Sequence, residues 1–507
     1  MTRWELYLKY VHKLDDVLWD MGMVHGIKID NEARLKLQKL LTRRVSHYKS
    51  WASRHAPMCI RPVKRYKNFP STDLPIEHVK VIKPVKTCTR CGAFPVTKTG
   101  HVVKKGGKNG VPLNECRGAE IALVDQQVEE YDVRLPFNPL STDQLKAYAL
   151  HHHHPLAVNI ETGLKTKLDD DQITKLIKRF GKNHPIYSLV KAGKKVNTTK
   201  TRYVDSWIPD ERGYLYGRFQ HSPETFRLAQ QEHNFMNVSH RGDVPYATEL
   251  RRCIIPSSGC RLIEADSSSV EAVMTGWYMG SESYMNIARK GVHAYAACKE
   301  LGIPFTDANR KMIKNTAKYA MLYARKKRIT HGVSYGMGAN LLAQNYPDIF
   351  PSKRAAQLEI DGFLELLPEL AAWHDRLRKE AWKNGCLTSP WGITNYYYQV
   401  YSKDIKTGKF KLGPDAKSVI AFLPQHSNGM FQRETLLMLG DSWVRPYMCA
   451  IGHCHDSAGL DVPLDKVDDA VLLLKEVMTR PIKEMDGLTI GVDVKVGKNW
   501  ADMEVVE

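Results

Sequence analysis

The sequence predicts an α+β fold, in which strands and helices mix without the regular alternation of a parallel sheet. Three observations predict it. Apolar residues recur at helical spacing near the N-terminus, short apolar runs bounded by turn residues lie in the second half, and a stretch rich in Pro, Lys, Gly and Cys separates two helical regions. With 507 residues and 43% hydrophobic content, the chain can build two or three packed subdomains.

The N-terminal region is predicted to be helical over residues 1–55, because Leu6, Tyr10 and Leu14 recur every four residues. The pattern breaks at GIKID, residues 26–30, and then continues. Residues 56–135 show little apolar periodicity, so they are predicted to form an inserted module or a long loop. Helical patterning returns over 137–205, where Ser141-Thr142-Asp143 precedes a helix as capping candidates.

The second half of the chain supplies the predicted strands. They are short apolar runs that end in turn residues, at 260–266, 388–401, 448–456, 458–464 and 487–497. The runs 448–456 and 458–464 are predicted to pair as a hairpin. Helices are predicted over 281–345 and 414–440. The expected core is an antiparallel sheet with helical attachments.

The charge of the chain predicts a polyanionic partner. The net charge is +19 and the pI is about 9.3, and the basic residues recur along the whole chain beside Tyr, Trp and His. Nucleic acid is therefore favoured over a generic basic surface and over membrane lipid. The apolar stretches are too short and too charged to span a membrane, and the N-terminus lacks the pattern of a signal peptide. A cytoplasmic protein is expected, in the host cytoplasm if a phage encodes it.

Two aspartates occupy similar places in the predicted sheet. Asp266 ends one apolar strand, and Asp456 lies at the tip of the hairpin. Carboxylates at strand ends beside a basic cleft suit phosphoryl transfer with two Mg²⁺ ions, because Mg²⁺ prefers hard oxygen ligands. On position alone the signal is weak, since strand-end aspartates are common turn formers.

A predicted helix over 323–335 supplies the context. Lys327, His331 and Tyr335 lie four residues apart, so they share one face of the helix. A cation, an imidazole and a phenol make a poor core but a good nucleotide surface. A solvated basic face would explain the charge but not the Gly336-Met337-Gly338 that follows.

These residues resemble the motifs of the family A DNA polymerases. Residues 266–271, DSSSVE, resemble the family's motif A, D-Y-S-Q-I-E. Residues 327–337 resemble motif B, K-x-x-x-F-G-x-x-Y-G-M, and residues 455–457, HDS, resemble motif C, H-D-E. Further similar stretches are GRF at 217–219, NFMNV at 234–238, VHA at 292–294 and VGKNWADM at 496–503.

The resemblance implies a right-hand polymerase with an antiparallel-sheet palm, helical fingers and a helical thumb. The thumb and its base would comprise 1–55 and 136–213, the palm 214–280 and 388–507, and the fingers 281–387. Residues 56–135 would be a Cys-containing insertion. The upstream exonuclease domain of many members is expected to be missing, so a separate exonuclease or other replisome protein is an expected partner.

The resemblance also implies roles for individual residues. Asp266 and Asp456 would hold two Mg²⁺ ions. The residues implied to contact the incoming nucleotide and the templating base are Lys327, His331, Tyr335, Glu271, His293 and Arg325. Among these, Lys327 would bind the triphosphate, His293 would lie near the β-phosphate, and Glu271 would be the steric gate against a ribose 2′-OH. The residues implied to contact primer–template DNA are Arg218, Asn234, Asn237, Lys417, Gln425 and His455.

Four positions depart from the family pattern. Ser457 replaces the glutamate of motif C, and His331 replaces the aromatic residue that faces the deoxyribose. Tyr323 stands where an arginine usually begins motif B, so Arg325 is a candidate substitute, and Lys417 stands where an arginine is common. These changes bear on sugar discrimination and fidelity more than on the metal chemistry.

The activity implied is primer-dependent, template-directed synthesis of DNA without proofreading. The alternatives are a single-subunit RNA polymerase, whose motif C resembles His-Asp-Ser, and a non-catalytic primer–template binding protein with the same fold. Glu271 argues against RNA synthesis, because RNA polymerases need a small residue there. The presence of both aspartates argues against a non-catalytic protein.

The insertion carries a candidate zinc site. Cys88-Thr-Arg-Cys91 has the spacing of half a zinc knuckle, and Cys116 with His101 or Cys59 could complete it. Tetrahedral Zn²⁺ would order a Lys- and Gly-rich segment that has no core of its own. A loop with free thiols is the alternative, because the second C-x₂-C is missing. The remaining cysteines are typical of reduced, buried thiols.

Overall fold

The computed structural model describes residues 3–56, 58–65, 75–88, 121–157, 168–221, 225–238, 244–403, 408–451 and 455–506. They fall into two compact units. The large unit comprises residues 1–40 and 198–507, and the small unit comprises residues 41–197. The first boundary lies inside helix α3 (Asn31–His55) and the second inside α6 (Ile186–Thr199). Residues 1–40 thus group with the sheet, whereas the sequence placed all of 1–55 with the helices after residue 136.

The described residues of the large unit form several α-helices besides parts of α3 and α6. They are α1 (Arg3–Tyr7), α2 (Lys13–Trp19), α7 (Ala247–Arg252), α8 (Val270–Met279), α9 (Glu282–Lys290), α10 (Val292–Glu300), α11 (Asp307–Asn315), α12 (Ala320–Ser334), α13 (Ala339–Asn345), α14 (Lys353–Leu366), α15 (Pro368–Asn384), α16 (Ala416–Gly440) and α17 (Val467–Met478). Among the residues described, no helix is long and apolar enough to cross a membrane.

The strands of the large unit form one main sheet and several two-stranded ladders. They are β1 (Ile27–Lys28), β5 (Tyr214–Leu215), β6 (Arg218–His221), β7 (Leu228–Gln231), β8 (Cys260–Ser268), β9 (Cys386–Thr388), β10 (Thr394–Tyr396), β11 (Tyr401–Lys403), β12 (Phe410–Leu412), β13 (Met448–Cys449), β14 (Ser457–Pro463), β15 (Gly491–Gly497) and β16 (Met503–Val506).

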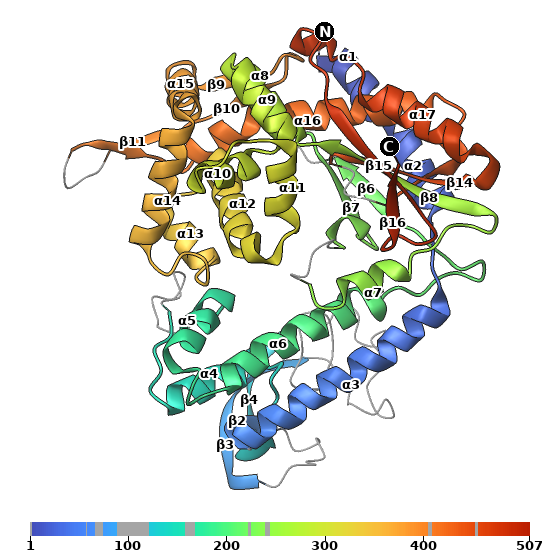
Figure 1. Cartoon of the computed structure of the whole chain (residues 1–507). Coiled ribbons are helices and arrows are strands. Elements are labelled where there is room, and N and C mark those ends of the chain that lie inside the picture. Colours follow the sequence, from blue (N-terminus) through green and yellow to red (C-terminus); the bar gives the residue numbers. More distant parts are fainter. Residues whose placement is uncertain are drawn as a thin grey trace. The chain divides into compact units, whose positions relative to one another are not determined.

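The main sheet has five antiparallel strands in the order β13-β14-β8-β15-β16. The central strand is β8, the predicted strand at 260–266. It is buried because Ile263 and Ala265 are fully covered, and it pairs with the predicted hairpin strand β14. Helix α17 packs on β8, β14 and β15, and Figure 1 shows it lying along the sheet. The predicted antiparallel sheet is confirmed.

Helices α9 to α14 form a group beside this sheet (Figure 1). Several of them begin at a side-chain cap. Ser281 accepts a hydrogen bond from the backbone N–H of Tyr284 at the start of α9, and Thr306 accepts one from Asn309 at the start of α11. Such a cap typically stabilises a helix by about 1 kcal/mol. The caps therefore divide the predicted helical stretch 281–345 into separate short helices.

The N-terminal helices pack against the long helix α16. Tyr10 and Leu14 are fully buried in the main core. The hydroxyl of Tyr10 donates to Glu434 Oε1 (2.6 Å), and Arg433 Nη1 donates to the backbone oxygen of Tyr10 (2.6 Å). Both partners lie on α16, so these contacts hold residues 3–25 to the large unit.

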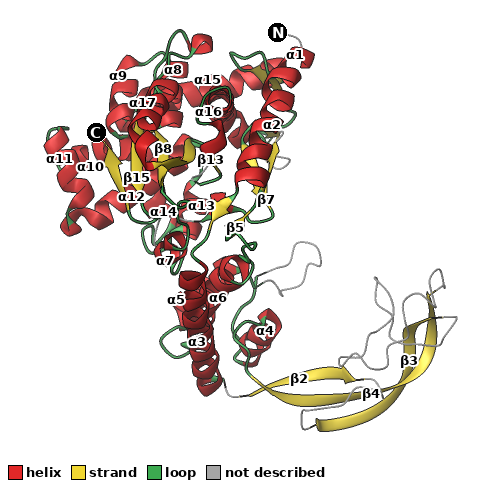
Figure 2. Cartoon of the chain, turned by 90° about the vertical axis from the view of Figure 1, so that its right-hand side faces the viewer, coloured by secondary structure: helices red, strands yellow, loops and turns green. Residues whose placement is uncertain are grey.

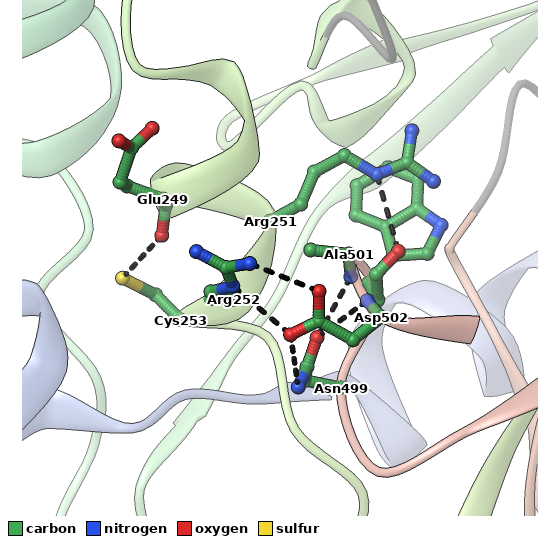
Figure 3. A network of polar contacts seen from close by, with 8 residues as sticks. Glu249, Arg251, Arg252, Cys253, Asn499, Ala501 and Asp502 are labelled. Carbon is green, nitrogen blue, oxygen red and sulfur yellow. Dashed lines mark hydrogen bonds and ion pairs between the residues drawn. The ribbon is translucent and has the colours of Figure 1, made fainter.

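The C-terminal tail is held against α7, as Figure 3 shows. Arg252 forms two hydrogen bonds with the carboxylate of Asp502, at 2.9 and 3.1 Å. The guanidinium of Arg251 lies 3.7 Å from the ring centroid of Trp500, and both side chains hydrogen-bond to Glu264 of β8. The Asn-Trp tail singled out in the sequence is therefore held to α7 and to the central strand of the sheet.

The small unit contains a sheet and a helical cluster. Strands β2 (Met58–Arg65), β3 (Pro75–Cys88) and β4 (Ile121–Pro136) pair antiparallel in the order β2-β4-β3, and Figure 2 shows them as one extended sheet. Helices α4 (Thr142–His151) and α5 (Asp170–Phe180) pack with α6 around Leu145, Ile173 and Tyr187. Ser141 caps α4 as predicted. The described part of the insertion is therefore a sheet rather than a loop.

The candidate zinc ligands Cys91, His101 and Cys116 lie outside the described residues. Cys88 ends strand β3 and Cys59 lies in β2, but only their strands are described. The zinc site stays a prediction.

Candidate functional site

The two aspartates come together at one end of neighbouring strands. Asp266 lies near the end of β8, opposite Ser457 of β14 and Asp493 of β15. Asp456 directly precedes β14, and its backbone oxygen accepts a 2.7 Å hydrogen bond from the N–H of Ser267. On α16, Gln432 donates to the backbone oxygen of Ser457 (2.7 Å), which holds the start of this strand. The positions predicted from the sequence thus become neighbours in space.

The electrostatics of this pair favour a cation. Burial, and next the negative charge of Asp456, raise the pKa of Asp266 to about 7, and Lys495 opposes the effect. A divalent cation would relieve this repulsion, and carboxylate oxygens are ligands that Mg²⁺ accepts. Among the described residues, no cluster of three or more His, Cys, Asp or Glu side chains encloses a metal site. Two carboxylates fit Mg²⁺ all the same, since it takes further ligands from water and substrate phosphates.

A cavity of about 1070 Å³ opens in front of the aspartates. Its sheet wall carries Asp266, Asp456 and Asp493, and its helical wall carries Lys327 and His331 of α12. Helix α12 therefore presents the predicted lysine and histidine to the predicted acids. The cavity thus combines acidic and basic groups, as a site for a metal-bound polyphosphate requires.

A smaller pocket of about 180 Å³ adjoins this cavity, because both are lined by His293, His331 and Asp456. Glu271 and Tyr335 line the smaller pocket as well. Tyr335 immediately follows α12, where the chain turns into Gly336 with a φ of +66°. Five of the six residues predicted to contact the nucleotide or templating base therefore surround two adjoining spaces.

Glu271 is held firmly in the first turn of α8. It forms an ion pair with Arg227 and a hydrogen bond with Asn428 of α16. Burial, and next the charge of Asp456, raise its pKa to about 7. Arg227 itself is mostly buried, and burial lowers its pKa. Arg227 and Asn428 were not predicted from the sequence, because nothing in their local patterns links them to a residue more than 40 positions away.

The prediction for Arg325 is not supported by its position. Arg325 forms ion pairs with Glu300 and Glu359, on a side of α12 that does not line either cavity. Tyr323 lines the large cavity instead, and its hydroxyl is 3.0 Å from Nε2 of His293. The physical reason is helical spacing: residue 323 is one turn before Lys327, whereas residue 325 faces away from it.

Five cationic residues on the helical wall of the large cavity were not predicted. They come from α9 and α11, and they are Arg289, Lys290, Arg310, Lys311 and Lys314. The spacing of 310, 311 and 314 on a capped helix is a signal that could have placed them on one face. Their approach to the aspartates could not be predicted, since it depends on how the helices pack.

The residues predicted to contact DNA lie outside the two cavities. Arg218 is exposed on β6 and pairs with Glu232 at 3.8 Å. Asn234 accepts a hydrogen bond from the backbone N–H of Asn237 and so caps a short 3₁₀ turn. On α16, the exposed Lys417 lies beside Gly336.

Two further predicted DNA contacts are only partly exposed. His455 immediately precedes Asp456 and is half-buried. Gln425 is half-buried on α16. Their DNA contacts stay predictions.

The comparisons with known proteins agree on one family. The family model for DNA polymerase family A matches residues 113–502. The chain is 24% identical to the thermostable DNA polymerase I of Thermus filiformis over 419 residues, which are 79% of this chain and 46% of that protein. It is 23% identical to the DNA polymerase I of Deinococcus radiodurans over 402 residues, 76% of this chain and 38% of that protein. The chain thus spans less than half the length of these curated relatives.

A solved structure shows the same fold. It is the POL domain of Pol1 from M. smegmatis in complex with DNA primer-template and dNTP. The TM-score is 0.68 at 16% identity, and the match covers 98% of this chain and 71% of that one. The architecture is the right-hand polymerase fold that the sequence predicted. Since the family model covers most of the sequence, the chain belongs to DNA polymerase family A.

Proposed function

We propose that this chain is a template-directed DNA polymerase that adds deoxynucleotides to the 3′-OH of a primer. One observation carries the proposal. Asp266 and Asp456, which are distant in sequence, end neighbouring strands and face Lys327 and His331 across a single cavity. Acids that can hold Mg²⁺ opposite groups that can hold a triphosphate are what nucleotidyl transfer requires.

We assign the polymerase subdomains within the two units. The main sheet with α8, α16 and α17 is the proposed palm, and helices α9 to α15 are the proposed fingers. The helices of the small unit form the proposed thumb, and its three-stranded sheet is the insertion. The N-terminal residues 3–25 support the palm, because they pack on α16.

The reaction is an in-line attack of the primer 3′-oxygen on the α-phosphorus, with pyrophosphate leaving. Asp266 and Asp456 would hold two Mg²⁺ ions, which when bound supply positive charge at the attacking and leaving oxygens. The side chains of the chain position the reactants and neutralise charge. Lys327 contacts the triphosphate from α12, and Tyr335 faces the templating base.

The unpredicted cationic wall extends this triphosphate site. Lys311 and Lys314 of α11 line the same cavity as Lys327. Tyr323 holds the imidazole of His293 through their 3.0 Å hydrogen bond. These side chains can bind the outer phosphates and the pyrophosphate product, in place of the arginine that Tyr323 replaces.

Glu271 is the proposed gate against ribonucleotides. Its carboxylate is fixed by Arg227 and Asn428 at the edge of the small pocket. A fixed side chain excludes a 2′-OH more effectively than a mobile one, because moving it would break both contacts. This arrangement supports DNA synthesis over RNA synthesis.

Primer extension on a recessed duplex tests the proposal. The wild type, with Mg²⁺ and either dNTPs or NTPs, is compared with Asp456→Asn and with Asp465→Asn, an exposed control at the far end of β14. We expect extension with dNTPs only, and a loss of at least about a thousand-fold in Asp456→Asn, since metal binding contributes several kcal/mol. Extension with NTPs would favour an RNA polymerase. Duplex binding without extension by the wild type would leave a non-catalytic binding protein.

The insertion and the further partners are proposed on the sequence alone. One structural Zn²⁺ bound through Cys88 and Cys91 would be found as about one equivalent per chain, and it would be lost in Cys88→Ser. Metal-free protein of normal stability would refute the zinc site. A separate exonuclease is the proposed proofreading partner, and a pull-down with the intact chain tests it.

A further inference from the structure

An exposed aromatic face lies on the hairpin of β11 and β12, which connects the proposed fingers to helix α16 of the proposed palm. Strands β11 and β12 pair with Tyr401 opposite Leu412 and Lys403 opposite Phe410. Because side chains alternate along a strand, these four residues share one face. Trp382 of α15 joins them, with its ring centroid 5.5 Å from Tyr401 and 5.9 Å from Phe410. We call these five residues the hairpin face.

The hairpin face is open to solvent. Trp382 is 57% exposed, Phe410 63% and Leu412 54%. Tyr398, close by in sequence, is 89% exposed. Large aromatic side chains gathered on an exposed surface generally mark a binding site. The face therefore calls for a partner that stacks on aromatic rings.

The base of the hairpin is rigid. The carboxylate of Asp415 accepts hydrogen bonds from the backbone N–H groups of Tyr398 (2.9 Å) and Gln399 (2.7 Å). Gly413 donates its backbone N–H to Val400 (2.8 Å), and a Cβ on Gly413 would lie 2.0 Å from the backbone oxygen of Gln399. The backbone is thus packed too closely for a side chain at 413. The aromatic rings are presented by a fixed support.

The positive charge near the hairpin face favours the binding of a polyanion. Residues 376–415 contain eight Lys or Arg and three Asp or Glu. Lys379 and Lys383 on α15 and Lys403 on β11 are exposed. Lysines that can contact phosphates beside rings that can stack on bases are the combination that binds single-stranded nucleic acid.

The hairpin face is connected to the small pocket. Arg378 of α15 lies with Nη2 3.6 Å from the position that a Cβ of Gly336 would take. Arg378 also interacts electrostatically with Tyr401 of the hairpin face. Gly336 follows Tyr335, which lines the small pocket, so Arg378 has one neighbour beside the pocket and another on the hairpin face. A strand that passed from Tyr335 toward the hairpin would run beside Arg378 before it reached the aromatic rings.

We propose that the hairpin face binds the single-stranded template ahead of the templating base. The proposal rests on the polymerase function proposed above, because that function supplies a single strand at Tyr335. Unpaired bases stack on Trp382 and Phe410, and the lysines contact the phosphates. Binding here is independent of sequence, since every base offers a ring to stack on.

Binding to two primer–templates tests the proposal. They share one duplex and carry a 5′ template overhang of about 2 or about 12 nucleotides. We expect the wild type to bind the long overhang about ten-fold more tightly, as stacking of one or two bases provides. The double variant Trp382→Ala/Phe410→Ala should lose this difference and keep its affinity for the short overhang, which also shows that it is folded. Trp382→Phe should retain the difference.

The control is Trp19→Ala, a 58% exposed tryptophan on α2 outside the hairpin face. It should behave as the wild type. A double variant that keeps the ten-fold preference would overturn the proposal and leave the face to a protein partner. The assay needs no chemistry, so the two proposals fail separately. Overhang-dependent binding without extension would refute only the polymerase function, and normal extension without overhang dependence would refute only the template path.

Discussion

The two sides of helix α12 carry the same kinds of residue and serve different purposes. On the side of the large cavity, Lys327 and His331 face the aspartates of the sheet. On the other side, Lys326 forms ion pairs with Glu300 (2.5 Å) and Glu359 (3.0 Å), and Arg325 pairs with the same two glutamates. Adjacent cations on one helix thus divide between the cavity and ion pairs with neighbouring helices. The carboxylates that the sheet brings to one side, and neighbouring helices to the other, decide which groups each cation meets.

The largest expected effect distinguishes the two sides by activity. Lys327→Ala should lower kcat/KM for dNTPs by about 100- to 1000-fold, because a charge-assisted contact to a phosphate that strengthens in the transition state contributes about 3–4 kcal/mol. Lys326→Ala should lower it by less than about three-fold. Single-turnover extension measures both. Equal losses in the two variants would show that the sides do not differ.

The second effect is on the pH dependence of stability, and it concerns the contact between α15 and the end of α12. His374 of α15 is buried and hydrogen-bonds to the backbone of Ser334 at the end of α12. Burial, and next the charge of Arg378, lower its pKa to about 4. The unfolded chain therefore binds a proton that the folded chain does not between about pH 6.5 and pH 4.

Stability should accordingly fall as the pH drops through that window. At pH 5, His374 should lower the free energy of unfolding by about 2 kcal/mol relative to pH 8. Between pH 8 and pH 5, the free energy of unfolding of His374→Gln, measured with urea, should fall by about 2 kcal/mol less than that of the wild type, since glutamine does not titrate. Buried His426, whose pKa is lowered to about 3, adds a similar dependence that this variant leaves in place. An unchanged pH dependence would contradict the prediction.

The third effect concerns the binding of dNTPs by two lysines of the large cavity, Lys311 and Lys314. Lys311→Ala/Lys314→Ala should raise KM for dNTPs by about three- to ten-fold and leave kcat within about two-fold, because half-exposed or exposed cations contribute about 1 kcal/mol each to binding. Inhibition by inorganic pyrophosphate should weaken in parallel. The control is Lys299→Ala, an exposed lysine of α10 that lines a different cavity. A fall in kcat with KM unchanged would argue against a binding role.

The smallest expected effect is a change in stability, on the side of α12 that carries Arg325 and Lys326. Glu359→Gln removes one partner of both Arg325 and Lys326, and Glu300 remains for each. The free energy of unfolding should fall by about 0.5–1 kcal/mol, as for other partly exposed ion pairs, with no change in extension. Chemical unfolding and steady-state extension measure the two quantities. A large loss of activity would place this side of α12 in the site.

Much of the fold was predictable because it follows from local pattern. The buried run at 260–266, the hairpin around Asp456 and the long helix after 414 all appear where the sequence places them. For the insertion, the sequence left two alternatives open, a module or a long loop, and the structure forms a three-stranded sheet there. Its strands β3 and β4 are stabilised by pairing with each other, and local pattern alone does not show this long-range contact.

Most residues of the candidate site were predictable from the sequence, whereas the residues that hold them in place were not. The order of the motifs, the strand-end position of Asp266 and Asp456, and the four-residue spacing of Lys327, His331 and Tyr335 can all be derived from the amino-acid sequence. The contacts of Glu271 with Arg227 and Asn428, the ion pairs of Arg325 with Glu300 and Glu359, and the place of Lys311 and Lys314 at the cavity depend on how distant segments pack. Spacing along a helix or strand sets which residues share a face, whereas the packing of distant segments sets what that face meets.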